Sequence, residues 1–294
     1  MADAELTKLR ALIAARPAAA DLAGRREGFD ANAKVFPLDP AIIVEPVSAG
    51  GVPAEWTTAP GADTSRVVLY LHGGGYVFGS ILSHRHLVAE IGRVAGCRTL
   101  ALHYRLAPEH PFPAPVEDTI AGYRFLLASG IQPGHIALVG DSAGGGLVVA
   151  AMVAIRDAGL PQPACGWCIS PWVDMEGLGA SFVTQAKRDP IVTKETIGDI
   201  TKMYLNGADP RSPLASPIYA DLAGIAPLLI QVGAAETLLD DSTQLASKAG
   251  GADVPVRMDV WPEMIHVWHL FHPMLGAGKR AIAEGADYVR AAMK

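Results

Sequence analysis

Residues 136–144 read IALVGDSAG, and this stretch decides the fold. The apolar run Ile136–Val139 predicts a buried strand, and a long helical pattern follows the serine directly. Between them lies G-x-S-x-G, a pattern in which the serine occupies a sharp turn between a strand and a helix. Gly140 and Gly144 are small enough for such a turn, so Ser142 would project at the carboxyl end of the strand. The stretch predicts a nucleophilic serine, with an ordinary Gly/Ser-rich turn as the alternative.

On both sides of this stretch, short apolar runs bounded by Gly and Pro alternate with helical patterns. The predicted strands are Arg66–Leu71, Thr99–Tyr104, Ile136–Val139, Trp167–Ser170, Leu228–Val232 and Val256–Trp261. The predicted helices are His84–Ala95, Val116–Ser129, Ala143–Ala158, Leu238–Ala249 and Lys279–Met293. Alternating strands and helices are typical of βαβ units, so we predict an α/β fold with a mostly parallel sheet and helices on both faces.

The composition excludes several classes of protein. The 294 residues are 50% hydrophobic and 18% charged, which excludes a disordered chain. A net charge of −6 without a dense basic run argues against a nucleic-acid partner. The longest apolar run, Leu147–Ile155, is too short to span a membrane, and Asp3 and Glu5 stand where an export signal carries positive charge. We therefore expect a cytoplasmic protein with no membrane span.

Three cysteines are too few for a disulfide scaffold in a chain of this size. Cys165 and Cys168 have C-x-x-C spacing, but one such pair cannot complete a four-cysteine zinc site, and it falls inside a predicted strand. We predict both as core residues.

A run of glycines, His72-Gly73-Gly74-Gly75, follows the strand predicted at Arg66–Leu71. Consecutive glycines allow backbone N–H groups to point into a cavity, as an oxyanion hole requires. The N–H of Ala143, next to the serine, would add one more donor. A flexible loop is the alternative, and a phosphate cradle is disfavoured because no Gly-Lys-Ser/Thr follows. His72 is expected to support the loop through a structural hydrogen bond.

A serine nucleophile needs a base, and behind such a turn the order is serine, acid, histidine. His266 follows the strand Val256–Trp261, which predicts it at the carboxyl edge of the sheet. His269 and His272 have a spacing that suits a metal, but no acidic partner accompanies them, so we interpret both as structural.

The acid follows the strand Leu228–Val232, in the stretch from Gly233 to Asp241. Glu236 lies in the loop after that strand and is our choice for orienting His266. Asp240 and Asp241 are interpreted as solvated charges of the next helix.

Together, HGGG at 72–75, YRLAPEHPFPAP at 104–115, GDSAGG at 140–145 and His266 resemble the bacterial hormone-sensitive-lipase family (family IV) of α/β-hydrolases. The resemblance covers the chain from about residue 40 onward. It implies the α/β-hydrolase fold, a carboxylesterase with a Ser/acid/His triad, and a helical cap.

Position by position, the resemblance implies Ser142 as nucleophile, His266 as base, and Gly74, Gly75 and Ala143 as oxyanion donors. The acid pattern of this family is commonly D-x-L-x-D, but here the stretch reads Glu236-Thr-Leu-Leu-Asp240. Glutamate thus stands where the family commonly has aspartate.

The predicted division of the chain is residues 1–40 as N-terminal cap helices, 41–173 as the first core part, 174–208 as a cap insertion and 209–294 as the second core part. The Ala-rich first thirty residues or so predict one amphipathic helix. Phe182, Met203 and Tyr204 of the insertion, with Trp172 just before it, are candidates for an acyl pocket or for ordinary packing. Arg105 and Glu109 are expected to pair within a proline-stiffened loop.

We therefore predict a serine carboxylesterase that hydrolyses small, short-chain acyl esters and requires no cofactor or metal. An amidase or formamidase with the same triad is the alternative enzyme, and a non-catalytic receptor on the same fold is the alternative outside enzymes. A homodimer paired through the apolar strand Val256–Trp261 is a further hypothesis.

Overall fold

Eight strands form one sheet in the computed structural model, which describes residues 2–15 and 21–293. Their order is β1-β2-β4-β3-β5-β6-β7-β8; β1–β2 and β2–β4 pair antiparallel, and all other neighbours pair parallel. The strands are β1 (Ile43–Ala49), β2 (Val52–Thr58), β3 (Asp63–Leu71), β4 (Cys97–Leu102), β5 (Ile136–Asp141), β6 (Cys165–Ile169), β7 (Leu228–Gly233) and β8 (Val256–Trp261). The mostly parallel sheet that the sequence predicts is confirmed.

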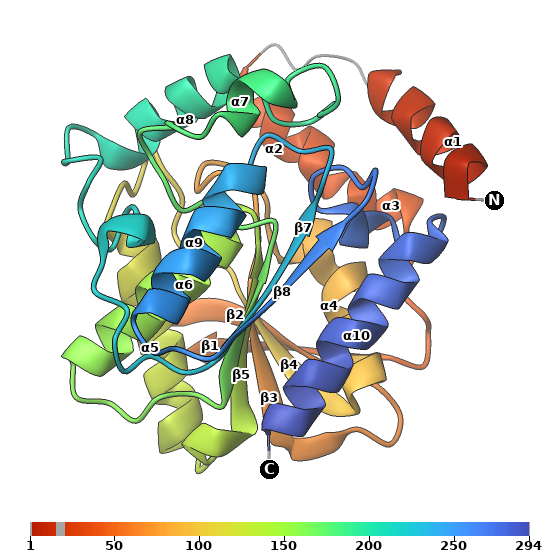
Figure 1. Cartoon of the computed structure of the whole chain (residues 1–294). Helices are drawn as coiled ribbons and strands as arrows, with labels where there is room; N and C mark the ends of the chain where they lie inside the picture. Colours follow the sequence, from red (N-terminus) through yellow and green to blue (C-terminus); the bar gives the residue numbers. More distant parts are fainter. Residues whose placement is uncertain (1, 16–20, 294) are drawn as a thin grey trace.

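Helices cover both faces of this sheet (Figure 1). One face carries α4 (Ile81–Ala95) and α10 (Gly276–Ala292); the other carries α5 (Ala114–Ala128), α6 (Ala143–Asp157) and α9 (Leu239–Gly251). Strand β3 shows why two cores form, because successive side chains point to opposite faces. Val67 and Leu69 belong to the core under α5 and α6, whereas Val68 and Tyr70 belong to the core under α4 and α10. No helix within the described ranges is both long and apolar enough to cross a membrane.

The predicted strands differ from the observed ones mainly at one edge of the sheet. Strand β8 has the predicted bounds, whereas β3 begins three residues before the predicted Arg66. The hairpin β1–β2 was not predicted, because Pro46 and Pro53 interrupt the apolar pattern and much of β1 is exposed. Gly50 and Gly51 join the two strands with positive φ values of 65° and 94°.

The N-terminal segment forms more than the single helix that the sequence predicts. The described parts are α1 (Ala2–Ala14), α2 (Leu22–Asp30) and α3 (Asn32–Val35); residues 16–20 lie outside the described residues. Asp21 starts α2 as a separate helix, because its carboxylate accepts a hydrogen bond from Gly24 N at 2.8 Å.

The segment 174–208 contains α7 (Ser181–Thr184) and α8 (Lys194–Leu205) and has no strand within it. Helices α2, α7 and α8 lie above the carboxyl ends of the parallel strands (Figure 1). Within the described ranges there are also three short 3-10 helices: η1 (Pro133–His135), η2 (Pro217–Tyr219) and η3 (Trp268–Phe271).

All three cysteines lie in the core, as predicted for Cys165 and Cys168. Burial raises the pKa of the Cys165 thiol to about 12, so it stays protonated at neutral pH. The C-x-x-C pair therefore has neither the exposure nor the acidity of a redox motif.

Candidate active site

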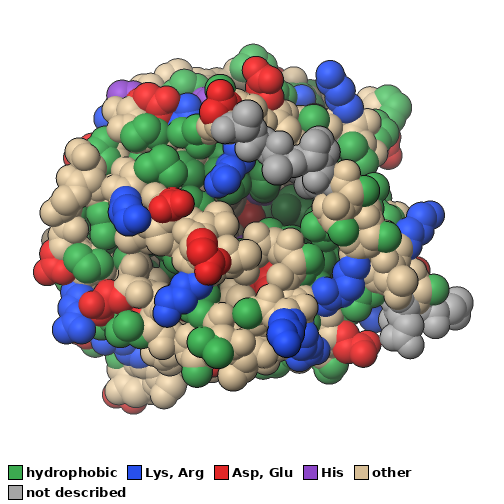
Figure 2. Space-filling view, turned by 90° about the horizontal axis from the view of Figure 1, so that it is seen from above, with side chains coloured by type: hydrophobic (Ala, Val, Ile, Leu, Met, Phe, Trp, Pro, Cys, Tyr) green, Lys and Arg blue, Asp and Glu red, His purple; other side chains and the backbone are tan. Residues whose placement is uncertain are grey.

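The carboxyl ends of four neighbouring strands, β5 to β8, each lead into a polar residue. Ser142 follows β5 directly and Ser170 follows β6 directly. Glu236 lies three residues past β7, and His266 lies five residues past β8. Ligand sites of α/β proteins form at this edge of the sheet, and seen from above, the surface there is hollowed, with hydrophobic side chains in the hollow (Figure 2).

Ser142 occupies a strained turn between β5 and α6. Its φ of 53° and ψ of −120° are rare for a residue with a side chain. The turn depends on its glycines, because a Cβ on Gly144 would lie 1.9 Å from Leu71 O and one on Gly140 would lie 2.4 Å from Gly144 O. Ser142 is itself partly exposed, while its neighbours on both sides are buried.

Glu236 and His266 are brought together by a short hydrogen bond. Nδ1 of His266 lies 2.7 Å from Oε2 of Glu236. The other carboxylate oxygen, Oε1, accepts from Ser170 Oγ at 2.9 Å and from Gly233 N at 2.5 Å. Glu236 is fully buried, so these donors replace the water that its charge would otherwise bind.

The electrostatic surroundings favour a positive charge on His266. Burial alone would lower the pKa of the imidazole, but the hydrogen bond and the charge of Glu236 outweigh it and raise the pKa above 6.5. Asp189 and Asp141 act in the same direction from farther away.

Two residues of this network were missed by sequence reasoning. Besides donating to Glu236, Ser170 Oγ accepts from Val267 N at 3.2 Å, which links it to the residue after His266. Asp189, in the segment 174–208, accepts from Thr237 N at 2.8 Å and so fastens that segment beside Glu236. The position of Ser170 just after a strand was a usable signal; Asp189 offered none.

The interpretation of Asp240 and Asp241 as solvated charges is wrong. Asp240 accepts from Ser181 N at 3.0 Å, and Asp241 is buried and accepts from Val173 N at 2.9 Å and Asp174 N at 3.1 Å. Burial raises the pKa of Asp241 to about 8. Asp241 therefore holds the loop after β6 and Asp240 holds the start of α7, both from the first turn of α9.

The side chain of Asp141 fixes the start of the glycine loop that follows β3. Its Oδ1 accepts from Gly73 N at 2.9 Å and from the Tyr70 hydroxyl at 2.7 Å. Gly74 and Gly75 have positive φ values of 114° and 62°, and a Cβ on Gly74 would lie 2.1 Å from Phe78 O. Among the described residues, no acceptor takes the N–H of Gly74, Gly75 or Ala143.

His72 supports this loop through a hydrogen bond, as predicted, since its Nδ1 lies 2.8 Å from Gly73 O. Its ring stacks on Tyr104 with centroids 4.2 Å apart, and the Tyr104 hydroxyl donates to His72 O at 2.6 Å. Burial lowers the pKa of His72 to about 3, so the ring is neutral.

The predicted pair between Arg105 and Glu109 is absent, because each has a different partner. Arg105 Nη2 lies 2.7 Å from Asp118 and 3.1 Å from Glu117. Glu109 pairs instead with Arg26 of α2, at 2.7 Å.

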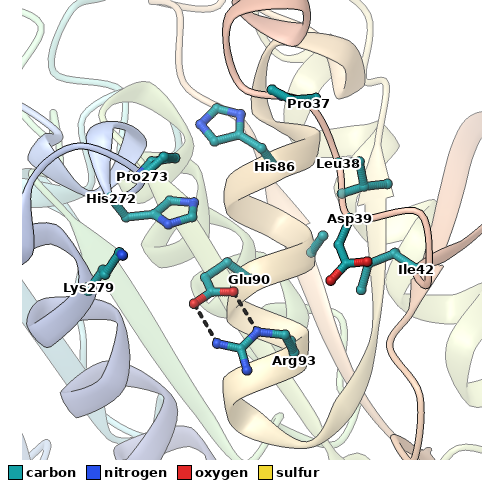
Figure 3. A pocket seen from close by; sticks show the side chains of 11 residues that line it. Pro37, Leu38, Asp39, Ile42, His86, Glu90, Arg93, His272, Pro273 and Lys279 are labelled. Carbon is teal, nitrogen blue, oxygen red and sulfur yellow. Dashed lines mark hydrogen bonds and ion pairs between the residues drawn. The ribbon is translucent and has the colours of Figure 1, made fainter.

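His269 and His272 are structural, as predicted. His269 Nε2 lies 3.0 Å from Gln231 Oε1, and the ring of His272 stacks on His86 with centroids 5.6 Å apart. His272 lines a groove of about 370 Å³ that runs over α4, between α10 and residues 37–42 (Figure 3). In the described part of the chain, no group of three or more His, Cys, Asp or Glu side chains is arranged to hold a metal ion.

Aromatic residues pack α8 against the glycine loop. Tyr204 of α8 stacks on Tyr76 with ring centroids 3.9 Å apart, and the ring centroid of Trp172 lies 6.1 Å from that of Tyr76. Phe182, like these three, is buried, whereas Met203 is half-buried. Ile200 of the same helix reaches Gly75, whose added Cβ would meet Ile200 Cγ2 at 2.8 Å.

Comparisons with known proteins agree on one architecture and one chemistry. A family model described as "alpha/beta hydrolase fold" matches residues 68–270. An acetyl-hydrolase of Streptomyces hygroscopicus is 50% identical over 246 residues, which cover 84% of this chain and 82% of the relative. An esterase of Acinetobacter venetianus is 31% identical over 264 residues, or 90% and 87% of the two chains. A solved esterase of the bacterial hormone-sensitive lipase family is 52% identical, with a TM-score of 0.96 over 99% of this chain and 98% of that one.

Proposed function

This chain belongs to the bacterial hormone-sensitive-lipase family of α/β-hydrolases and is a carboxylic ester hydrolase, and on that basis we propose that it cleaves short-chain acyl esters with a Ser142–Glu236–His266 triad. One observation carries the assignment. A buried Glu236–His266 pair follows the strands that lie two and three positions from the strand of the strained serine turn, at the same edge of the sheet. This combination is what nucleophilic catalysis by a serine requires.

In the proposed reaction, Ser142 Oγ attacks the ester carbonyl carbon while His266 Nε2 takes the hydroxyl proton. Glu236 stabilises the resulting imidazolium. The same interaction raises the pKa of His266 and so makes it a better acceptor for the serine proton. His266 then returns the proton to the alkoxide as the C–O bond breaks, and the alcohol leaves. Water, activated by the same histidine, attacks the acyl-serine and releases the carboxylic acid.

We assign the oxyanion hole to the N–H groups of Gly74, Gly75 and Ala143. The support is that these donors have no acceptor within the described residues, and that the glycine loop is bonded through Gly73 N to Asp141, the residue before Ser142. Donors fixed before the reaction stabilise the tetrahedral intermediate without reorganisation, and one such donor is worth about 2.7–4 kcal/mol.

We further propose that residues 1–40 and 174–208 form a cap and that it favours small acyl groups. Helices α2, α7 and α8 lie over the strand ends (Figure 1), and the stacked Tyr76 and Tyr204 fill space beside the glycine loop. A relative at 50% identity is described as an acetyl-hydrolase, which agrees with a short acyl chain.

The test is hydrolysis of p-nitrophenyl esters from acetate to palmitate by the wild type, Ser142→Ala and Glu236→Ala. We expect fast turnover of the short chains, its loss in Ser142→Ala, and a strong reduction in Glu236→Ala. Turnover that survives Glu236→Ala would refute the assigned acid. Turnover confined to p-nitroanilides would replace the esterase by an amidase.

We also propose that two copies pair through β8. It is the last strand of the sheet, and Val260 is 47% exposed on it. Sedimentation velocity of the wild type and Val260→Lys tests this, since a charge on an edge strand opposes pairing. A wild-type monomer at micromolar concentration would contradict the proposal.

A further inference from the structure

Arg26 belongs to α2, yet its guanidinium makes its hydrogen bonds to two loops of the hydrolase core. Nε donates to Val77 O at 2.8 Å, and Nη2 donates to Ala107 O at 2.9 Å. Nη1 and Nη2 also bind the two carboxylate oxygens of Glu109, each at 2.7 Å. A planar guanidinium suits this fork of acceptors, which an ammonium cannot match.

The first of these bonds leads directly to the glycine loop. Val77 N and Phe78 N donate to Gly74 O at 3.1 and 3.0 Å, so residues 74–78 form a closed turn. Arg26 binds this turn at Val77 O, and Gly74 O belongs to the Gly74–Gly75 peptide, whose N–H, that of Gly75, we assign to the oxyanion hole. A chain of hydrogen bonds thus connects the guanidinium to the peptide that carries an oxyanion donor.

The second bond fastens a neighbouring loop to the same turn. Ala107 N donates to Tyr76 O at 2.9 Å, while Ala107 O accepts from Arg26. Glu109 completes the junction through its ion pair with the guanidinium. Arg26 therefore stands where the turn 74–78 and the loop 104–109 meet.

Other contacts hold α2 against the segment that follows the glycine loop. The rings of Phe29 and Phe78 are 5.0 Å apart, and the Ser80 hydroxyl donates to Asp30. The hydrogen bond with Glu109 raises the pKa of Arg26 further above its ordinary value, so the guanidinium stays charged. The helix thus follows the loop from Val77 to Ser80.

From this geometry we propose that Arg26 is a positioning residue for ester hydrolysis: it holds the glycine turn so that the N–H groups of Gly74 and Gly75 meet the developing oxyanion. The inference rests on the proposed function. Without the guanidinium, Val77 O and Ala107 O lose their donor and the turn relaxes. Small displacements of catalytic groups cost up to about 100-fold in rate, so we expect kcat to fall roughly 10- to 100-fold.

The experiment compares Arg26→Ala and Arg26→Lys with a matched control, Arg156→Ala. Arg156 also binds two carbonyls, Asp221 O at 2.8 Å and Ala223 O at 2.7 Å, and a carboxylate, Asp157. It lies near the end of α6, about 20 Å along the helix from Ser142. All variants are assayed as full-length protein with p-nitrophenyl butyrate, and Tm is measured alongside.

Three readouts separate positioning from simple stabilisation. In Arg26→Ala we expect kcat to fall while KM changes less than about threefold, since the oxyanion forms only in the transition state. A trifluoromethyl ketone, which forms an oxyanionic adduct with the serine, should bind correspondingly more weakly. Millimolar guanidinium chloride, far below denaturing concentrations, should restore part of kcat. Arg156→Ala should lower Tm but keep kcat within about twofold.

The outcomes are distinct. An unchanged kcat in Arg26→Ala, or a rise in KM alone, would overturn the positioning role of Arg26. If Ser142→Ala is inactive in the same assay, the proposed triad is not affected by that result. Retention of turnover in Ser142→Ala would instead overturn the proposed function and this inference with it. If Arg26→Ala does not fold, Arg26→Lys decides: we expect a folded enzyme with reduced kcat, and wild-type kcat there would contradict the proposal.

Discussion

His266 Nδ1 lies 2.7 Å from Glu236 Oε2, and both side chains are almost completely buried. The pair joins two loops 30 residues apart, one after β7 and one after β8. Because the contact is short and shielded from water, the carboxylate both directs the imidazole and stabilises its protonated form. The acid–base behaviour of the enzyme should therefore depend on Glu236.

Replacing Glu236 by Gln should reduce kcat by about 10⁴-fold, the scale known for removing the charge of a triad acid. It should also shift the pH profile. Protonated His266 cannot accept the serine proton, so kcat/KM falls as pH drops through the His266 pKa, which Glu236 holds above 6.5. Without that charge the acid limb should move to lower pH.

The control for this profile is Asp240→Asn, since Asp240 binds Ser181 and not His266. Its kcat/KM and acid limb should stay close to those of the wild type. An acid limb that does not move in Glu236→Gln would exclude Glu236 as the partner of His266.

Removing the Ser170 hydroxyl should affect both stability and turnover. In Ser170→Ala, Val267 N loses its acceptor and Glu236 loses a donor, which should destabilise the protein by about 1–3 kcal/mol. Because Glu236 is then held less firmly, kcat should fall roughly tenfold. Urea unfolding and steady-state kinetics measure the two effects.

Ser242→Ala is the matched control, because Ser242 is equally buried but donates only to Leu238 O in its own helix region. We expect a loss of stability there without a change in kcat. Equal kinetics in the two variants would show that Ser170 has no influence on Glu236.

Adding a single methyl group at Gly74 should reduce activity strongly. The Cβ of Gly74→Ala would lie 2.1 Å from Phe78 O, in a backbone with φ of 114°, so the turn must open and move its N–H. We expect a loss of about 10²- to 10³-fold in kcat, as for an oxyanion donor. Gly51→Ala has a similar φ of 94° but no atom within 4 Å, so it should lower Tm and leave kcat unchanged.

Asp241→Asn should stabilise the protein increasingly as pH rises from about 4 to about 8. In the unfolded chain this carboxyl ionises near its ordinary pKa of 3.8, whereas burial raises its pKa in the folded protein to about 8. The folded state thus binds the extra proton in that range, and wild-type stability falls as pH increases. Asparagine keeps an acceptor for Val173 N and Asp174 N but does not ionise.

Unfolding by urea near pH 5 and near pH 8 measures the difference, which should be larger at the higher pH. A gain that is the same at both values would mean that Asp241 has an ordinary pKa in the folded protein.

The parts of the fold that sequence predicts well are those with an unbroken local pattern. Strand β8 has its predicted bounds, and the pattern predicts Ser142, Glu236 and His266 because each follows an apolar run. The structure brings Glu236 and His266 into contact. Partners that lie far apart in the sequence are what the local pattern does not predict. The spacing of Arg105 and Glu109 suggested a local pair, but the partner of Glu109 is Arg26, 83 residues away. The predicted strand Trp167–Ser170 includes Ser170, whereas β6 ends at Ile169 and leaves Ser170 at the strand end, where its hydroxyl reaches Glu236.

The bonds of Arg26 have a consequence for attempts to alter the substrate range by recombination. Suppose that the N-terminal segment is exchanged for that of a homologue that accepts bulkier esters. Arg26 is then replaced, while its acceptors Val77 O, Ala107 O and Glu109 remain in the recipient. A chimera without an arginine at this point should lose speed on every ester rather than gain new ones. The arginine and its acceptors need to be transferred as one unit.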